Sequence, residues 1–488
     1  MLKTQTSAIA SGNYQTSKAA SDILEAGGNA YDAILAALFM SFVTEPLLSS
    51  PGGGGYLLAH PKNKKAKIFD FFAQTPFNKT QSKRDFYPIC GDFGDAQQEF
   101  HIGLASAAIP GVPAGIFAIH QHYGSLPLID IASAAITMAK KGMIVDKLHA
   151  EVIQILTPIL NHSKTAKALY SDSKGCILKE GDIKANPQLA QFLTDFASNP
   201  RDWFYFGMPA KNIRADMREK HGLLRKEDFE NYQVHIREPL IETINNWKVI
   251  TNAQPTTGGM LITAQLKHAA QNTEKETHKK FIQAMIHADK LKSKQGFQSS
   301  KGTSHMNVID TEGNVASLTI SNGEGCGYVV PASGFMLNNF LGEEDINTQG
   351  FFNFPENTRM ASMMSPTIIE QIGCNNKIAL GTGGSNRIKT AMFQVIWQII
   401  GENKTLDQAV NHPRFHYEKD MIDVEKGINQ SVVEQIKANY QIINLWNNRS
   451  LYFGGINAVQ QGKTNLAVSD SRRNGTSLVN MSMIKQPT

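Results

Sequence analysis

The segment Gly302-Thr303-Ser304-His305 joins a conformationally free glycine to a hydroxyl side chain at the start of a β-rich stretch. A threonine hydroxyl does not ionise by itself, but an α-amine, with a pKa of about 7.7 to 8.0, can accept its proton. That amine exists only after the Gly302-Thr303 bond is cut, and glycine leaves the carbonyl of this bond unshielded. The hypothesis is that the chain cuts itself here and that Thr303 becomes a nucleophile with its own amine as base. An ordinary strand start is the alternative interpretation.

A second candidate element is the turn Gly-Thr-Gly-Gly-Ser at 381–385, which precedes an amphipathic helix expected over 388–401. The first turn of a helix has free backbone N–H groups and the positive end of the helix dipole. Gly383 and Gly384 are therefore candidate donors to the oxyanion of a tetrahedral intermediate, a contribution typically worth about 3 to 4 kcal/mol. An ordinary turn is again the alternative, because glycine is enriched in turns.

Both elements need a scaffold, and the pattern of the chain predicts one. Two β-rich runs, 306–310 and 315–320, flank Thr-Glu-Gly-Asn and predict a hairpin that places Thr303 at the start of a strand. A second hairpin is expected from 368–371 and 377–380, directly before the glycine turn. Apolar periodicity predicts helices over 17–26, 30–43, 103–148 (with a break at 124–127), 151–161, 187–196 and 259–271.

The composition indicates a globular protein large enough to bury a sizeable core. The net charge of +5 is spread over 488 residues without a basic, aromatic-rich block, so we expect no nucleic-acid partner. The most apolar early run, 30–43, is too short to span a bilayer, so no membrane partner is expected either. No signal peptide is visible at the N-terminus, which favours a cytoplasmic location. The four cysteines lie far apart, which argues against a zinc site or a disulfide framework.

Short motifs run in order through essentially the whole chain. The N-terminal ones are Gly-Gly-Asn-Ala-Tyr-Asp-Ala at 27–33, Glu-Pro at 45–46, Gly-Gly-Gly-Gly-Tyr at 52–56, Pro-Gly at 110–111, Tyr-Gly at 123–124 and Arg-Glu-Pro at 237–239. The C-terminal ones are Thr-Ser-His at 303–305, Leu-Asn-Asn at 337–339, Ser-Pro at 365–366, Gly-Gly-Ser at 383–385, His-Pro-Arg-Phe at 412–415, Phe-Gly-Gly at 453–455 and Ser-Asp-Ser-Arg-Arg-Asn-Gly at 469–475. This series resembles the gamma-glutamyltranspeptidase family.

The resemblance implies an α/β fold, a four-layer αββα sandwich of the N-terminal-nucleophile hydrolase type. It implies cleavage between Gly302 and Thr303 and transfer of a gamma-glutamyl or related acyl group to Thr303, then to water or an amine. No cofactor and no metal are expected. Residues 1–302 would form a large subunit ending in a mobile linker at about 272–302, and residues 303–488 a small one. The two fragments would remain together as a heterodimer within one intertwined body.

The positions of the motifs also imply roles for individual side chains. Ser321 and Asn322 would hydrogen-bond the nucleophile or the substrate amine, although one residue appears deleted between 319 and 325. Ser362 would bind the donor carboxylate, and Gly383 and Gly384 would form the oxyanion hole. A purely structural hydroxyl is the alternative for both serines, because hydroxyls readily satisfy local backbone groups.

One departure from the family pattern bears on the substrate. Phe72 stands where the family has an arginine that clamps the substrate α-carboxylate, and a phenyl ring cannot make that charged contact. Met363 also replaces the second serine of the usual pair. We therefore expect a more apolar pocket, weak activity on glutathione, and better activity on acyl groups with a ring that stacks on Phe72. Another arginine, such as Arg387 or Arg359, would be the way to rebuild the clamp.

Acidic ligands for a substrate α-amine are expected among Glu343, Glu344 and Asp345, with a spacing altered by Gly342. Two other functions compete with the enzyme. The chain could keep the fold without catalysis and act as a binding protein, or it could bind a phosphate or nucleotide through glycines 52–55 or 381–384. The first glycine run is followed by a strand rather than a helix, which disfavours a nucleotide site.

Overall fold

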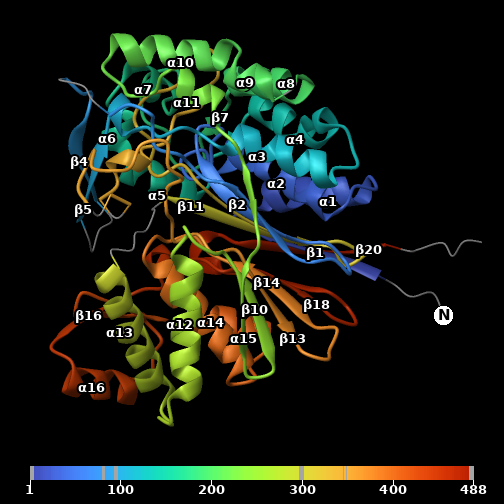
Figure 1. Cartoon of the computed structure of the whole chain (residues 1–488), viewed down its shortest axis with the longest axis vertical. Helices are drawn as coiled ribbons and strands as arrows, with labels where there is room; N and C mark the ends of the chain where they lie inside the picture. Colours follow the sequence, from blue (N-terminus) through green and yellow to red (C-terminus); the bar gives the residue numbers. More distant parts are fainter. Residues whose placement is uncertain are drawn as a thin grey trace, which may run out of the picture.

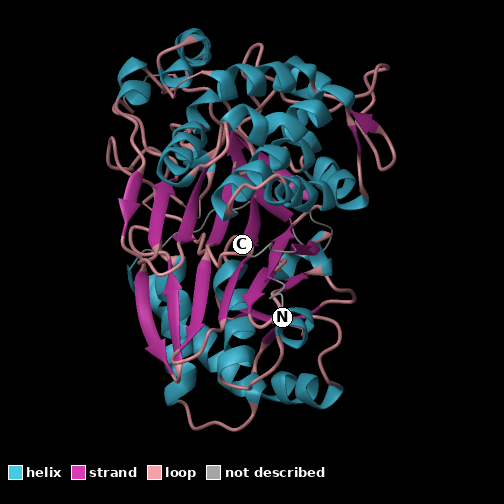
Figure 2. Cartoon of the chain, turned by 90° about the vertical axis from the view of Figure 1, so that its right-hand side faces the viewer, coloured by secondary structure: helices cyan, strands magenta, loops and turns pink. Residues whose placement is uncertain are grey.

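The computed structural model describes residues 5–79, 83–92, 97–199, 201–295, 302–344, 346–347 and 349–482. Two antiparallel sheets lie face to face, and helices cover the outer side of each (Figure 1). Figure 2 shows the strands of both sheets between an upper and a lower helical layer. The chain therefore forms the αββα sandwich that its motifs predicted.

The first sheet has the strand order β20-β1-β11-β12-β2-β3-β8. Its strands are β1 (Gln5–Ser11), β2 (Gly54–His60), β3 (Lys67–Phe71), β8 (His235–Arg237), β11 (Thr303–Ile309), β12 (Val315–Ser321) and β20 (Thr476–Ser482). The hairpin predicted after Gly302 is confirmed as β11 and β12. Since strand side chains alternate between faces, Met306 and Val308 pack into the helical layer while Ile309 faces the other sheet.

The second sheet has the order β19-β18-β14-β13-β10-β9. Its strands are β9 (Leu240–Ile244), β10 (Trp247–Thr251), β13 (Thr367–Gln371), β14 (Lys377–Gly381), β18 (Asn457–Gln461) and β19 (Leu466–Ser469). The second predicted hairpin is confirmed as β13 and β14. Apolar side chains such as Ile68, Val315 and Ile368 fill the space between the sheets.

The helices beside the first sheet come from the N-terminal part of the chain. They are α1 (Tyr14–Glu25), α2 (Ala30–Thr44), α3 (Val112–Tyr123), α4 (Leu128–Lys141), α5 (Lys147–Ile155), α6 (Thr157–Leu160), α7 (Lys164–Leu169), α8 (Pro187–Ser198), α9 (Asp202–Tyr205), α10 (Met208–Glu219) and α11 (Lys226–Glu230). Helix α2 is buried on every face and begins with a capping box formed by Asn29 and Asp32. The helices predicted over 17–26, 30–43 and 187–196 are confirmed, and 103–148 divides mainly into α3 and α4.

The helices beside the second sheet come from the C-terminal part. They are α12 (Gly258–Gln271), α13 (Thr277–Gln295), α14 (Arg387–Ile400), α15 (Leu406–Asn411) and α16 (Gln430–Asn439). The prediction of a mobile linker over 272–302 is wrong for most of its length, because α13 occupies 277–295. Phe281, Ile282 and Met285 of this helix are buried. The helix packs against α12, and the Phe281 ring contacts Phe393 of α14, so the apolar run inside this polar segment belongs to the core. Residues 296–301 lie outside the described part of the chain.

Short elements complete the structure at its edges. They are β4 (Tyr87–Asp92) with β5 (Gln97–Ile102), β6 (Met143–Ile144) with β7 (Ile183–Lys184), β15 (Phe415–Glu418) with β16 (Met421–Val424) and β17 (Ile442–Leu445), and single 3-10 turns at Leu104–Ser106, Phe340–Gly342, Leu451–Phe453 and Ser471–Arg473. None of the helices in the described ranges has the length and apolar character needed to cross a bilayer.

Candidate active site

Thr303 lies at the start of β11, opposite Ser321 at the end of β12. Only 1% of its surface is exposed. The Ser321 hydroxyl donates a hydrogen bond of 2.8 Å to the carbonyl oxygen of Gly302. That carbonyl belongs to the bond that the sequence predicts to be cut, so a donor already polarises it in the uncut chain.

The backbone at position 302 requires glycine for two reasons. Gly302 has a φ of +43°, in the left-handed region that other residues rarely adopt. A Cβ atom there would also collide with the carbonyl oxygen of Gly323. Any side chain at 302 would therefore move the candidate scissile bond away from Ser321.

The glycine turn after β14 lies directly against Thr303. A Cβ atom on Gly383 would collide with the Thr303 carbonyl oxygen and would lie 2.6 Å from Nη1 of Arg473. Gly384 has a φ of +126°, and its carbonyl accepts a hydrogen bond of 3.0 Å from the backbone N–H of Arg387, the first residue of α14. The structure thus brings together the two elements that the sequence singled out, one from each sheet. Their role as an oxyanion hole stays a prediction.

Asn322 is buried next to Ser321, away from the pocket described below. Its Nδ2 donates to the carbonyl of Met336 at 3.3 Å, and its Oδ1 has no hydrogen-bond partner within the described ranges. A Cβ atom on Gly53 would collide with the Ser321 carbonyl and would lie 3.2 Å from this Oδ1. Close backbone packing therefore accounts for the glycine at 53 without a phosphate ligand.

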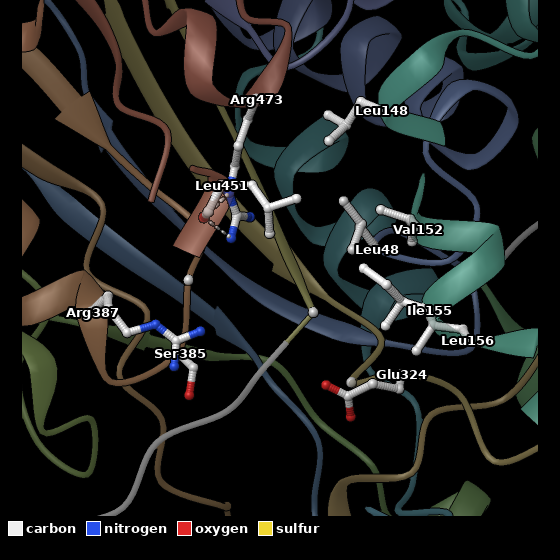
Figure 3. Close-up of a pocket in the computed structure, with 13 residues that line it drawn as sticks. Leu48, Leu148, Val152, Ile155, Leu156, Glu324, Ser385, Arg387, Leu451 and Arg473 are labelled. Atoms are coloured by element: carbon white, nitrogen blue, oxygen red, sulfur yellow. Dashed lines mark hydrogen bonds between the residues drawn. The ribbon is translucent and has the colours of Figure 1, made fainter. Parts of the chain in front are cut away.

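A pocket with a cavity volume of about 80 Å³ is lined in part by Gly302, the residue before Thr303. Figure 3 shows the side chains around it. One side carries two cations, Arg387 and Arg473, together with Ser385 and Gly384. The other side is apolar and is formed by Leu48, Leu148, Val152, Ile155, Leu156 and, near Arg473, Leu451. Glu324 lies on the apolar side, beside Ile155 and Leu156 (Figure 3). The pocket thus offers a charged half and an apolar half.

Phe72, interpreted from the sequence as part of the substrate pocket, does not line it. Its side chain has no exposed surface and packs against Tyr56 and Phe340 in the core between the sheets, with ring centroids 5.6 and 4.7 Å away. The expectation that a substrate ring stacks on Phe72 is therefore wrong, because this ring fills the core. Arg359 is also buried, 3.4 Å from the carboxylate of Asp70, so it does not replace the missing clamp either.

Ser362 is not brought to the pocket. It is completely buried, and its hydroxyl oxygen accepts a hydrogen bond of 3.1 Å from the backbone N–H of Met364. Met363 is buried in the core between the second sheet and its helices. The structural alternative considered for Ser362 therefore fits the geometry, and the predicted contact with a donor carboxylate does not.

The acidic candidates separate in space. Glu343 is buried, and its Oε1 lies 2.6 Å from the place that a Cβ on Gly323 would take, next to the pocket. Glu344 is exposed, and Asp345 lies outside the described residues. Of the predicted acidic ligands, Glu343 is thus the one that remains a candidate.

Arg473 and Glu45 contact residues 303 and 304, although the sequence assigned them no role. Arg473 Nη1 donates to the carbonyl oxygen of Thr303 at 3.2 Å. The Ser304 hydroxyl lies 3.1 Å from both carboxylate oxygens of Glu45. The motifs at 45–46 and 469–475 contain both residues, so their presence in the family pattern was the available signal.

Burial shifts the pKa values of both Glu45 and Arg473. Burial raises the pKa of Glu45 to about 7; the Ser304 hydrogen bond opposes the rise, Asp146 adds to it, and Arg473 opposes it. Burial lowers the pKa of Arg473 to about 10, and the nearby cation of Arg387 lowers it further. An anionic group bound between the two arginines would offset this cost.

His305 is not placed to accept a proton in the pocket. Its ring packs over Gly381, and its Nδ1 lies 2.8 Å from the hydroxyl of Thr319. Burial lowers the pKa of His305 to about 3, so the ring is neutral near pH 7. The histidine of the Thr-Ser-His motif therefore joins the two sheets.

A Glu45→Gln variant is expected to flatten the pH dependence of stability. The Glu45 pKa rises from its ordinary 4.5 to about 7 on folding, so between these values the folded chain holds a proton that the unfolded chain has released. The contribution of Glu45 to stability therefore falls as pH rises through this window. Glutamine does not titrate, so the Tm of the variant should fall less than the Tm of its parent as the pH is raised from 5 to 7.5.

Thermal unfolding should be measured in an uncut Thr303→Ala background, so that processing does not differ between samples. Exposed Glu312 provides the matched control as Glu312→Gln, which should keep the parental pH dependence. Parallel Tm curves for the parent and Glu45→Gln would contradict the raised pKa.

Comparisons with known proteins find similar proteins that match over most of the chain. The family model described as Gamma-glutamyltranspeptidase matches residues 16–298 and 263–479 of the chain. The glutathione hydrolase proenzyme of Escherichia coli K12 is 27% identical over 489 residues, which cover 87% of this chain and 83% of that protein. The glutathione hydrolase proenzyme of Pseudomonas aeruginosa is 27% identical over 542 residues, which cover 97% and 94%.

Solved structures share the fold. A cephalosporin acylase from Bacillus halodurans aligns with a TM-score of 0.82 at 20% identity, covering 97% of this chain and 96% of that one. The Helicobacter pylori gamma-glutamyltranspeptidase aligns with a TM-score of 0.52 at 24% identity, covering 58% of this chain and 81% of that one. At these identities the likeness establishes a common architecture.

Proposed function

Because this chain belongs to the gamma-glutamyltranspeptidase family, we propose that it is a self-processing amidohydrolase and acyltransferase. It transfers a gamma-glutamyl or related acyl group through an acyl-Thr303 intermediate to water or an amine. The observation that carries this proposal is the position of the Gly302-Thr303 bond, with the Ser321 hydroxyl on its carbonyl and Gly383 against Thr303. Both relatives described above are named proenzymes, which supports a processing step.

Processing begins when the Thr303 hydroxyl attacks the Gly302 carbonyl carbon. The C–N bond breaks as the new amine takes a proton, and the chain is left joined by an ester. Water then hydrolyses the ester, which leaves a Gly302 carboxylate, the Thr303 hydroxyl and a free Thr303 α-amine. The Ser321 hydroxyl stabilises the developing charge on the carbonyl oxygen during the attack.

The order of strands in the first sheet supports a stable pair of fragments. Strands β20, β11 and β12 would belong to fragment 303–488, and β1, β2, β3 and β8 to fragment 1–302. Strand β1 lies between β20 and β11, and β12 pairs with β2, so the fragments alternate across the sheet. Separating them would break whole ladders of hydrogen bonds and expose the core.

Turnover uses the amine that processing releases. The Thr303 α-amine accepts the hydroxyl proton as Thr303 attacks the amide carbonyl of the donor. The N–H groups of Gly383 and Gly384 would bind the oxyanion, and the proton then passes to the departing amine. Water or a second amine attacks the acyl ester and restores Thr303. Nothing in the described residues favours the alternative of a binding protein without catalysis.

The test uses the matured protein and gamma-glutamyl p-nitroanilide, with and without a dipeptide as amine acceptor. The expected result is release of p-nitroaniline and, with the acceptor, a gamma-glutamyl tripeptide detectable by mass spectrometry. A protein that stays uncut and hydrolyses neither this anilide nor simple acyl anilides would overturn the proposal.

A further inference from the structure

The charged half of the pocket is formed by two arginines, Arg387 and Arg473. Arg387 stacks on the ring of Tyr452, 4.4 Å from its centroid, and its Nε donates to the Tyr452 carbonyl at 3.1 Å. Arg473 donates to the carbonyls of Leu451 and Thr303. Within the described part of the chain, neither guanidinium forms an ion pair, although both line the pocket. Two cations held by backbone carbonyls and a tyrosine ring, without an ion pair in these ranges, are arranged to receive an anion.

Two neighbouring arginines, Arg414 and Arg472, do form ion pairs, unlike the two arginines of the pocket. Arg414 pairs with Asp470 at 2.6 Å, and Arg472 pairs with Glu425 at 2.6 Å and with Asp470 at 3.1 Å. These pairs are buried and neutralise each other. Asp470 and Glu425 are therefore paired with arginines that do not line the pocket, whereas in the described ranges neither Arg387 nor Arg473 has a carboxylate within ion-pair distance.

The position of Arg387 indicates which part of a substrate carries the anion. Arg387 begins the helix that follows Gly383 and Gly384, the proposed oxyanion donors. An acyl group bonded to Thr303, with its carbonyl oxygen at this turn, would have Arg387 in the same pocket, so Arg387 is available to a charge on its distal end. The leaving amine would then face the apolar wall of Leu48, Val152 and Ile155, which lies across the pocket from Arg387 (Figure 3).

Among the described residues that line the pocket, the arginine half contains no acid for an α-amine. Among the described lining residues Glu324 is the acid, and Figure 3 places it across the pocket, beside Ile155 and Leu156. Its Oε2 also accepts a weak hydrogen bond of 3.4 Å from Asn339. An ammonium group next to Arg387 would meet two positive charges. The lining thus complements an acyl group of charge −1 better than a zwitterionic gamma-glutamyl group.

We propose that the preferred donor is the monoamide of a short dicarboxylic acid with an apolar amine as leaving group. Arg387, supported by the charge of Arg473, binds the distal carboxylate, and no α-amine is required. This inference rests on the proposed function and defines its substrate class. Arg387 comes from the turn between β14 and α14, whereas Phe72 follows β3 and lies in the core.

The experiment compares three p-nitroanilides that share one leaving group: glutaryl, gamma-glutamyl and pentanoyl. The kcat/KM for glutaryl should exceed that for pentanoyl by about tenfold or more, since charge-assisted bidentate contacts are strong, and should also exceed that for gamma-glutamyl. Arg387→Leu should lower the glutaryl-to-pentanoyl ratio of kcat/KM by about tenfold. Arg387→Lys should lower it by less, because lysine keeps the positive charge but lacks the paired N–H donors of a guanidinium. Exposed Arg449 provides the control, and Arg449→Gln should leave the ratio unchanged.

A glutaryl-to-pentanoyl ratio near one, or an equal loss on all three anilides in Arg387→Leu, would overturn the inference, and so would preference for gamma-glutamyl over glutaryl. A calorimetric titration with glutarate and pentanoate separates this outcome from failure of the proposed function. Glutarate binding that is lost in Arg387→Leu supports the anion site even without turnover. Equal binding of the two acids by the parent contradicts it.

Discussion

A Thr303→Ala variant is expected to remain one uncut chain and to release no measurable p-nitroaniline from any acyl anilide. Alanine lacks the hydroxyl that attacks the Gly302 carbonyl in processing and the donor amide in turnover, so a single deletion removes both reactions. The change should not unfold the protein, because Thr303 begins β11 and its backbone pairing with Ser321 is retained. Denaturing electrophoresis and mass spectrometry of the purified protein measure the first effect, and anilide hydrolysis the second.

Thr303→Ser is the matched control, since it keeps a hydroxyl and an α-amine. It should yield fragments 1–302 and 303–488 and retain part of the turnover. If Thr303→Ala were cut at the same bond, an external protease would be responsible, and the self-processing mechanism would have to be abandoned.

The second large effect is expected from Gly383→Ala. The new Cβ would collide with the Thr303 carbonyl oxygen and crowd Nη1 of Arg473, so the turn or the nucleophile must move. Loss of one oxyanion donor typically costs about 100-fold to 1,000-fold in kcat, and displacement of Thr303 adds to that loss. We therefore expect kcat on an anilide to fall by about 100-fold or more, together with slower processing.

Gly462→Ala is the matched control for this change. Gly462 is exposed, does not have a positive φ, and its Cβ would meet only Thr464 at 3.3 Å, so turnover should stay near that of the parent. A folded and processed Gly383→Ala protein with near-parental kcat would remove this glycine from the site. Circular dichroism and the Tm distinguish that result from misfolding.

Local patterns in the sequence were sufficient for the elements that hold Thr303. The hairpin of β11 and β12 was predicted from two β-rich runs and a glycine-containing turn, and the start of α14 from a glycine run before an amphipathic segment. These signals depend on neighbours in the chain, because side-chain periodicity and turn geometry are set within a few residues. The ordered motifs then identified the family and its αββα architecture.

The same patterns misjudged α13 and Phe72. In 272–302 the many polar residues hid a short apolar stripe, and only its packing against α12 and against Phe393 of α14 shows that the stripe is buried. Phe72 aligned with a substrate-binding arginine, yet its ring turns into the core beside Tyr56 and Phe340. The direction of a side chain at a strand end depends on what the facing sheet provides, and a motif does not contain that information.

The sequence by itself therefore determined the residue types, the hairpins, the glycine turns and the family. The tertiary structure alone decided which distant residues meet: Gly383 with Thr303, Glu45 with Ser304, and Arg387 with Arg473 in one pocket. The physical reason is that these pairs belong to different strands and helices whose approach is set by the packing of two sheets. A single chain gives no local signal for contacts made across a buried core.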